Sequence, residues 1–231
     1  MNSFLLEIGL EEVPASMIQP SIEQLKELVA KTLQQENLSG QIEIFGTPRR
    51  FGLLVRNLPA SQANRIEEIK GPPVEMAKDE KGHWKQAAIG FAKKNGIDPE
   101  KLEVRDFSGK EYLYAIKHLE GKTTNEILET SIVEWIHALR FPKNMRWGSY
   151  RQRFVRPIRW LTCLWNSEVV PVELEMLRSG NQSFGHRFLS KDSFTIDQAD
   201  EYENKLRDQW VIASPSKRRA RIEEQIQELE R

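Results

Sequence analysis

The sequence predicts an α+β protein with mixed, mainly antiparallel sheets packed against helices, arranged in one body or in two lobes. Helical and β-prone segments follow one another without the regular β-α-β order of a parallel sheet. Two pairs of β-prone segments are each joined by a short turn, which is typical of antiparallel hairpins. Hydrophobic residues make up 39% of the chain and charged residues 29%, a balance typical of a folded globular protein.

The first segments predict a strand, a helix and a hairpin. Residues 4–9 form a short apolar run, which predicts a buried strand. Residues 42–45 and 51–56 predict two strands joined by a turn. Between these segments, apolar residues recur at helical spacing and give the expected helix one apolar stripe. The stripe consists of Ile18, Ile22, Leu25, Val29 and Leu33.

The next segment is polar and contains little that could form a core. Residues 61–71 are polar, and Gly71-Pro72-Pro73 favours an extended, non-helical backbone. From there to Gly82 the chain is charged and low in apolar residues, so we expect a mobile loop. Residues 85–95 predict a short helix that ends at Gly96.

The middle of the chain predicts a second hairpin, a helix and the strands of a central sheet. Residues 102–107 and 112–119 are β-prone and flank a short turn. Residues 124–139 carry apolar residues spaced by four, which predicts a helix. Residues 157–172 are apolar and β-prone, so we expect them to supply strands to a central sheet.

The last segments predict a helix over residues 197–207, a short strand over 210–213 and a final helix over 214–231. Candidate lobes are 1–140 and 141–213. The final helix carries no glycine or proline stop signal, so we expect it to lead into a following domain of a longer polypeptide.

The bulk composition predicts a cytoplasmic protein. A single cysteine, Cys163, allows no internal disulfide and favours a reducing compartment. The first residues lack the features of a signal peptide, and no run approaches the roughly 20 apolar residues of a membrane span. The formal net charge is zero, because 34 Lys and Arg balance 34 Asp and Glu. A polyanionic partner must therefore be recognised by local clusters of charge.

Residues 140–167 form such a cluster, with seven basic residues and no Asp or Glu. Six are Arg, whose planar guanidinium matches phosphate oxygens. The basic residues are Arg140, Lys143, Arg146, Arg151, Arg153, Arg156 and Arg159. Aromatic residues that can stack on unpaired bases or fill a core alternate with them. They are Phe141, Trp147, Tyr150, Phe154, Trp160 and Trp165.

Other interpretations of this stretch remain open. Its arginines can pair with carboxylates from elsewhere in the fold, or they can form the solvated face of a half-buried strand. Smaller basic groups are Arg49-Arg50 at a strand entrance and Arg178, His186 and Arg187 around the Gly-rich loop 179–185. The glycines of this loop can bring backbone N–H groups to a phosphate, although the sequence matches no phosphate-binding fingerprint and favours an ordinary loop. The basic residues interpreted as a solvated helix face are Lys217, Arg218, Arg219 and Arg221.

The sequence offers no catalytic constellation. The histidines are widely separated, and one cysteine cannot build a thiolate zinc site, so we predict no metal site and no cofactor bound by this segment. Glu11 and Glu12 are adjacent and point in different directions, and Cys163 is interpreted as a small buried hydrophobic residue. The residues alone therefore predict a binding or structural module.

Eight motifs of the chain resemble, in the same order, motifs of the β subunit of bacterial glycyl-tRNA synthetase. The first four are Leu6-Glu7-Ile8-Gly9 with Glu11-Glu12-Val13-Pro14-Ala15, Thr47-Pro48-Arg49-Arg50, Lys70-Gly71-Pro72-Pro73, and Ala88 to Ala92. The last four are Phe141-Pro142-Lys143-Asn144-Met145-Arg146-Trp147-Gly148, Phe154-Val155-Arg156-Pro157-Ile158-Arg159-Trp160, Ser179-Gly180-Asn181, and Gly185-His186-Arg187-Phe188.

The resemblance implies an N-terminal region, 1–231, that forms about the first third of a subunit of an α2β2 heterotetramer. In that family the α subunit holds the class II active site, where ATP with Mg²⁺ activates glycine. The β subunit supplies tRNA recognition through domains farther along the chain. The resemblance thus implies a glycine–tRNA ligase whose reaction, ATP-dependent attachment of glycine to tRNA-Gly, belongs to the holoenzyme, and a segment that is not itself catalytic.

We expect this segment to bind the acceptor arm of tRNA and to take part in assembly. The alternative is a protein–protein assembly module that contacts the α subunit without touching RNA. A remnant editing or hydrolytic domain is a third hypothesis, for which no catalytic residues are present. The candidate RNA-binding residues are Arg146, Arg151, Arg153 and Arg156, then Arg187, with Lys143, Arg49 and Arg50.

Overall fold

The first strand, β1 (Asn2–Leu10), lies at the centre of a five-stranded antiparallel sheet in the computed structural model, which describes residues 2–79, 82–149, 151–175, 177–190 and 192–230. It pairs with β3 (Arg50–Leu58) on one side and with β9 (Ile158–Trp165) on the other. The edge strands are β2 (Gln41–Thr47) and β10 (Glu168–Val169). The mainly antiparallel α+β fold is confirmed.

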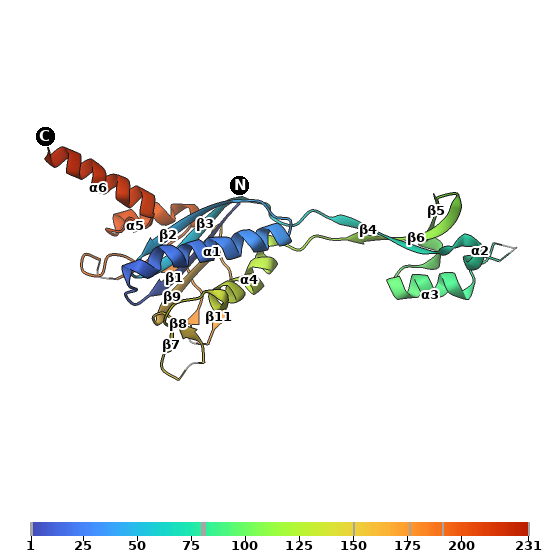
Figure 1. Cartoon of the computed structure of the whole chain (residues 1–231), viewed down its shortest axis with the longest axis horizontal. Coiled ribbons are helices and arrows are strands. Elements are labelled where there is room, and N and C mark those ends of the chain that lie inside the picture. The colour runs from blue at the N-terminus through green and yellow to red at the C-terminus, as the bar shows by residue number, and fades with distance from the viewer. Residues whose placement is uncertain (1, 80–81, 150, 176, 191, 231) are drawn as a thin grey trace. The chain divides into compact units, whose positions relative to one another are not determined.

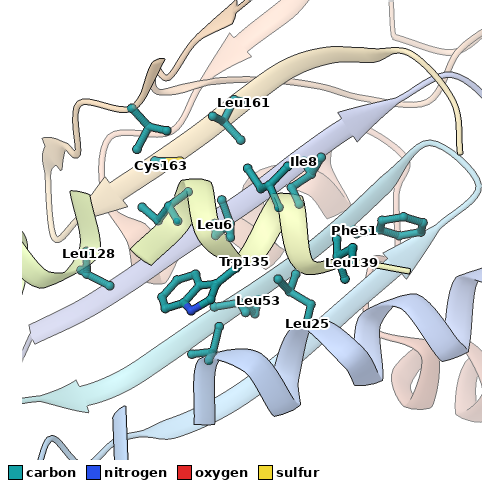
Figure 2. Close-up of a cluster of buried hydrophobic side chains, with 14 of the residues drawn as sticks. Leu6, Ile8, Leu25, Phe51, Leu53, Leu128, Trp135, Leu139, Leu161 and Cys163 are labelled. Atoms are coloured by element: carbon teal, nitrogen blue, oxygen red, sulfur yellow. The ribbon is translucent and has the colours of Figure 1, made fainter. Parts of the chain in front are cut away.

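One face of this sheet is covered by α1 (Ala15–Gln35) and α4 (Thr124–Ala138), as Figures 1 and 2 show. Trp135 of α4 is buried among the leucines of the sheet, and its Nε1 donates a hydrogen bond to Thr32 Oγ1 of α1 at 2.9 Å. All five residues of the predicted apolar stripe of α1 are buried, which confirms that helix and its orientation.

The other face is covered by η2 (Ala199–Glu201) and α5 (Tyr202–Asp208). Tyr202 and Leu206 pack there against Leu54 of β3. Because both faces are covered, β1 is buried from Ser3 to Leu10 without polar alternation. The strand predicted over residues 210–213 is wrong. That segment is a turn and irregular chain, which joins the sheet through one hydrogen bond, from Gly46 N to Ala213 O at 3.0 Å.

Cys163 lies in β9 on the face covered by α4 (Figure 2). Its side chain is fully buried, and this burial raises the pKa of the thiol well above its usual range. The prediction that it acts as a small hydrophobic residue is confirmed.

The chain divides into two units, and the division differs from the candidate lobes 1–140 and 141–213. Unit 1 comprises Met1–Gln62 and Lys122–Arg231, and unit 2 comprises Ala63–Gly121. The boundary does not fall at residue 140, because β9 pairs with β1 and so completes the sheet that begins at residue 2.

Unit 2 has a three-stranded antiparallel sheet with its own small core. Its elements are β4 (Arg65–Pro73), α2 (Val74–Ala77), α3 (Gln86–Asn95), η1 (Pro99–Lys101), β5 (Glu103–Phe107) and β6 (Lys110–Leu119). The predicted hairpin of β5 and β6 is confirmed, and so is the end of α3 at Gly96, whose φ is +66°. The prediction of a mobile loop as far as Gly82 is wrong over α2, because Ala77 of this helix is buried in the core of unit 2. Residues 80 and 81 of that loop lie outside the described residues.

The remaining elements of unit 1 are short strands and a final helix. They are β7 (Met145–Arg146), β8 (Arg153–Phe154), β11 (Glu173–Leu174), β12 (Leu177–Arg178), β13 (Gln182–Phe184), β14 (Ser193–Thr195) and α6 (Pro215–Leu229). The final helix α6 begins after the N-cap Ser214 and buries no residue. Among the helices that the structure describes, none has the length and apolar character needed to cross a bilayer.

Helix α4 begins with a capping box. Thr123 Oγ1 accepts a hydrogen bond from Glu126 N, and Thr123 N donates to Glu126 Oε2 at 2.9 Å. We expect Thr123→Ala to lower the free energy of unfolding by about 1 kcal/mol, because the first turn loses its side-chain acceptor. Urea unfolding checks this, with Thr123→Ser as the control that keeps the hydroxyl. Equal stability of the Ala and Ser variants would contradict the role of the cap.

Candidate nucleic-acid interface

The small hairpin of β7 and β8 carries part of the predicted basic stretch (Figure 1). Arg146 lies directly opposite Arg153 in the antiparallel pair, and both side chains are exposed. Like charges in this position repel one another. Within the described part of the chain, neither guanidinium has a carboxylate at ion-pair distance. The hairpin therefore holds two uncompensated cations side by side.

Aromatic residues anchor this hairpin to the core of unit 1. Phe154 is buried, and its ring packs edge-on against Phe141 at a centroid distance of 4.8 Å. Trp147 Nε1 donates a hydrogen bond to Phe154 O at 3.1 Å. A single carboxylate, Glu175, binds the turn through the backbone N–H groups of Arg151 and Gln152, at 2.6 and 3.3 Å, and leaves the guanidinium of Arg151 free among the described residues.

We call this surface the basic hairpin; its members are Lys143, Arg146, Arg151 and Arg153. All four side chains are exposed, and none has a carboxylate at ion-pair distance among the described residues. The interleaved aromatic residues mostly fill or border the core, so stacking on bases is not their common role. The aromatic residues that fill or border the core are Phe141, Phe154, Trp160 and Trp165. Tyr150 lies outside the described residues.

Two other arginines of the stretch, Arg156 and Arg159, lie beside Glu11 and Glu12, and Arg187 from outside the stretch joins them. Arg159 Nε lies 3.4 Å from Glu11 Oε1, and Arg156 Nε donates to the backbone carbonyl of Glu12 at 2.9 Å. Arg187 Nη1 pairs with Glu12 Oε1 at 2.7 Å. The interpretation that arginines of the stretch pair with distant carboxylates therefore holds for Arg159, and it does not hold for the described residues of the basic hairpin.

Arg50 is buried, with 1% of its surface exposed. Its Nη2 donates to Phe184 O at 2.5 Å, and its Nη1 lies 3.7 Å from Glu7 Oε1. The carboxylate of Glu7 also accepts hydrogen bonds from Trp160 Nε1 at 2.7 Å and from Ser183 Oγ at 2.8 and 2.9 Å. The guanidinium is thus held in the interior by contacts within the protein, and RNA binding by Arg50 stays a prediction.

Arg49, the residue before Arg50 in the chain, borders a pocket of about 460 Å³. The pocket lies between the turn from β2 to β3, residues 185–188, residues 210–212 and the start of α6. It brings Arg49 together with Arg187, although 138 positions separate them in the sequence. Arg218 of α6 completes it.

The glycines of the Gly-rich loop serve the packing of the fold, although Gly185 also lines this pocket. Gly180 N donates to Leu161 O at 2.9 Å, so this N–H is already used within the fold. Gly185 is needed for close packing, because a Cβ there would lie 2.2 Å from Ser190 Oγ and 2.7 Å from Gln209 Cβ. The loop is an ordinary packed connection, which was the alternative interpretation.

The basic residues of α6 are mostly paired at the surface, as expected for a solvated face. Lys217 pairs with Glu203, Arg219 with Glu223 and Arg221 with Glu224. Arg218 differs, and the prediction was wrong for it. Its Nη1 donates to Ile212 O at 2.7 Å and its Nη2 to Gly46 O at 3.1 Å, while its burial lowers its pKa.

Residues 4–231 match the family model described as "Glycyl-tRNA synthetase beta subunit". The chain belongs to this family. Relatives named "Glycine--tRNA ligase beta subunit" come from Listeria monocytogenes (42% identical over 230 residues), Shouchella clausii (42% over 228) and Gloeothece citriformis (39% over 234). The alignments cover 99, 98 and 99% of this chain and 33, 33 and 32% of those relatives, so the chain spans about a third of their length.

Membership of the glycyl-tRNA synthetase beta subunit family confirms the resemblance of the eight motifs. The relatives are ligase subunits by name, and the words "beta subunit" imply that their holoenzyme contains a partner subunit. In this chain, Thr47–Arg50 and Gly185–Phe188 meet at the Arg49 pocket. The motif around Arg146 forms one strand of the basic hairpin, whereas Glu7 and Gly9 of the first motif lie in the buried strand β1.

Sequence reasoning missed the exposed aromatic residues that border the pocket, Phe188 and Trp210. Trp210 follows a helix that the apolar pattern predicted, at a position where glycine is the usual residue. A large aromatic residue directly after a helix end is the signal that could have identified it.

Proposed function

We propose that this chain contributes binding of the tRNA acceptor arm to the ATP-dependent glycylation of tRNA-Gly. The holoenzyme of this proposal also contains an α subunit, at which ATP with Mg²⁺ activates glycine, and it works in the cytoplasm. Membership of the family supports the reaction. The basic hairpin supports the contact with RNA.

The observation that carries the RNA contact is the direct pairing of Arg146 with Arg153. A like-charged pair directly opposite on two strands is destabilising. Here the described carboxylates offset none of this repulsion at ion-pair distance. A phosphate between the two guanidiniums would offset the repulsion, since each can donate two hydrogen bonds to one phosphate group.

Within this proposal the basic hairpin positions the RNA and does not identify its bases. Guanidinium contacts with phosphates fix register and orientation without reading sequence. Arg156 and Arg187 have partners around Glu12 and act as a secondary, more rigid edge of the same contact. Identification of glycine tRNA therefore belongs to other parts of the holoenzyme.

A titration of the chain with an acceptor-arm minihelix of tRNA-Gly tests the proposal. We expect Arg146→Gln with Arg153→Gln to weaken binding at low salt by about tenfold or more, because two charged hydrogen-bonded contacts are lost. Arg219→Gln with Arg221→Gln is the matched control, since it removes the same charge from arginines that already have carboxylate partners. If both variants lose the same affinity for the minihelix, the loss comes from net charge alone, and the proposed contact between the basic hairpin and RNA is refuted.

A second candidate function, assembly with the α subunit, is favoured by α6. Ile222, Ile226 and Leu229 recur along one stripe of this helix and are 52, 49 and 88% exposed. An exposed apolar stripe of this kind is typical of a protein interface. Two results together would favour assembly over RNA binding. The wild-type chain would fail to bind the minihelix, and its co-purification with the α subunit would be lost in the variant Ile222→Ser with Ile226→Ser.

A further inference from the structure

We infer that the Arg49 pocket binds one unpaired nucleotide of an RNA, with its base stacked on Trp210 and its phosphate beside Arg49 and Arg187. This inference rests on the proposed RNA contact and specifies which part of the RNA the pocket takes. The basic hairpin would hold the duplex, and the pocket would hold a nucleotide that has left it.

Trp210 occupies a backbone position that favours glycine. Its φ is +62°, and it follows Gln209, the C-cap of α5. Trp210 N donates to Arg207 O at 3.0 Å and Val211 N donates to Leu206 O at 2.9 Å, which is the Schellman arrangement of a helix end. A bulky residue in this conformation is strained.

The strain at Trp210 brings little gain in packing, because its side chain is 68% exposed. A strained residue that the fold does not bury indicates a role in binding. The indole borders the pocket, where it offers a flat face to a ligand. A nucleobase is the flat group that stacks on such a ring.

A second exposed aromatic residue, Phe188, borders the same pocket and is 82% exposed. Its loop is ordered by His186, whose Nδ1 accepts hydrogen bonds from Phe188 N at 3.2 Å and Leu189 N at 3.3 Å. The backbone carbonyl of His186 accepts a third, from Ser190 N at 2.9 Å. The loop therefore presents Phe188 in a fixed place at the pocket rim.

The charge around the pocket favours an anion. The described residues that line it include four arginines and one carboxylate, Glu12, which is already paired with Arg187. Burial lowers the pKa of Arg49, and the nearby cations Arg50 and Arg187 lower it further. Buried Arg50 also lines the pocket; its Nη1 lies 3.7 Å from Glu7 Oε1, and its Nε and Nη1 donate no hydrogen bond to any described residue. A bound phosphate would offset this excess of positive charge.

The combination of features selects a nucleotide over simpler ligands. A bare phosphate needs the guanidiniums and makes no use of the two exposed rings. An apolar peptide needs the rings and gains nothing from four arginines. A nucleotide uses both, and the volume of about 460 Å³ lies within the range of roughly 300–1,000 Å³ typical of small-molecule sites. A free nucleotide shares this chemistry, so the test must separate the two sources.

The test compares two RNAs, a blunt hairpin and the same hairpin with a single-stranded tail of four nucleotides. We expect the tail to tighten binding to the wild-type chain by about tenfold, the effect of one stacked base. Trp210→Gly should abolish this gain and leave the affinity for the blunt hairpin unchanged. Its melting temperature should not fall, because glycine is the preferred residue at that backbone position. Trp210→Phe should retain most of the gain.

Arg49→Gln provides a second variant and should reduce the gain from the tail. By contrast, Arg146→Gln with Arg153→Gln should weaken the binding of both RNAs by the same factor. If the blunt hairpin binds and the tail adds nothing, or adds as much to Trp210→Gly, the inference is overturned and the proposed function stands. If the chain binds neither RNA, the proposed function fails. If AMP binds in a way that depends on Trp210 and the tail adds no affinity, the pocket binds a free nucleotide. The inference that the nucleotide belongs to an RNA is then overturned.

Discussion

Replacing Glu7 with Leu is expected to lower the free energy of unfolding of unit 1 by about 3–5 kcal/mol, because it breaks a buried ion pair from one side. Glu7 is fully buried and accepts hydrogen bonds from Trp160 and Ser183 while it faces Arg50. Without the carboxylate, the guanidinium of Arg50 keeps its charge in the interior, and two donors lose their acceptor. Urea unfolding of the purified variant measures the loss.

The double variant Glu7→Leu with Arg50→Met is the control for this prediction. Removal of both charged partners in favour of apolar side chains of similar size often restores stability. We therefore expect the double variant to be more stable than Glu7→Leu alone. If the double variant is the less stable of the two, the loss in Glu7→Leu does not come from an uncompensated charge.

Gly9→Ala is the second change with a large expected effect. A Cβ at this position would lie 1.9 Å from Cδ2 and Cε2 of the Trp160 indole, far inside van der Waals contact. The indole must move, and its movement also breaks the hydrogen bond from Nε1 to Glu7. We expect a loss of about 3 kcal/mol, at the upper end of the usual cost of overpacking a core.

Gly90→Ala is the matched control for Gly9→Ala. Gly90 lies within α3 of unit 2, and a Cβ there would meet nothing within 4 Å. Because alanine favours a helix more than glycine does, this variant should gain up to about 1 kcal/mol. Differential unfolding by urea compares both with the wild type. A Gly9→Ala variant as stable as the wild type would contradict the packing of Trp160 over β1.

The contacts of Glu7 and Gly9 give both residues a structural role in this chain. Glu7 organises the interior around Arg50, and Gly9 leaves space for the indole that binds Glu7. The sequence alone offered no reason to connect positions 7, 50, 160 and 183, since the connection arises only when β1 pairs with both β3 and β9.

The parts of the fold that sequence predicted are those with a clear apolar period. The stripe of α1 follows the helical repeat, and β1 is an apolar run that two covered faces explain. Strand β4 was not predicted as a strand, because four of its nine residues are charged and exposed and no alternation marks it. Pairing with β6 makes β4 a strand, which the residues of β4 alone do not indicate.

The candidate site was predictable only in part, for a physical reason. Arg49 and Arg50 are neighbours in sequence and both line the pocket, yet only Arg50 is buried, with its guanidinium bound to Phe184 O and facing Glu7. The local charge of residues 140–167 did indicate the basic hairpin. It could not show that Arg159 finds a carboxylate at Glu11, since that contact joins segments about 150 residues apart.

The salt dependence of minihelix binding shows whether the uncompensated guanidiniums of the basic hairpin contact RNA phosphates, as we propose. The slope of log K against log salt concentration counts the phosphate contacts that a protein makes. For Arg146→Gln with Arg153→Gln we predict a slope shallower than that of the wild type by about two units, one for each lost contact. The Arg219→Gln, Arg221→Gln control should keep the wild-type slope. An unchanged slope in the hairpin variant would contradict the claim.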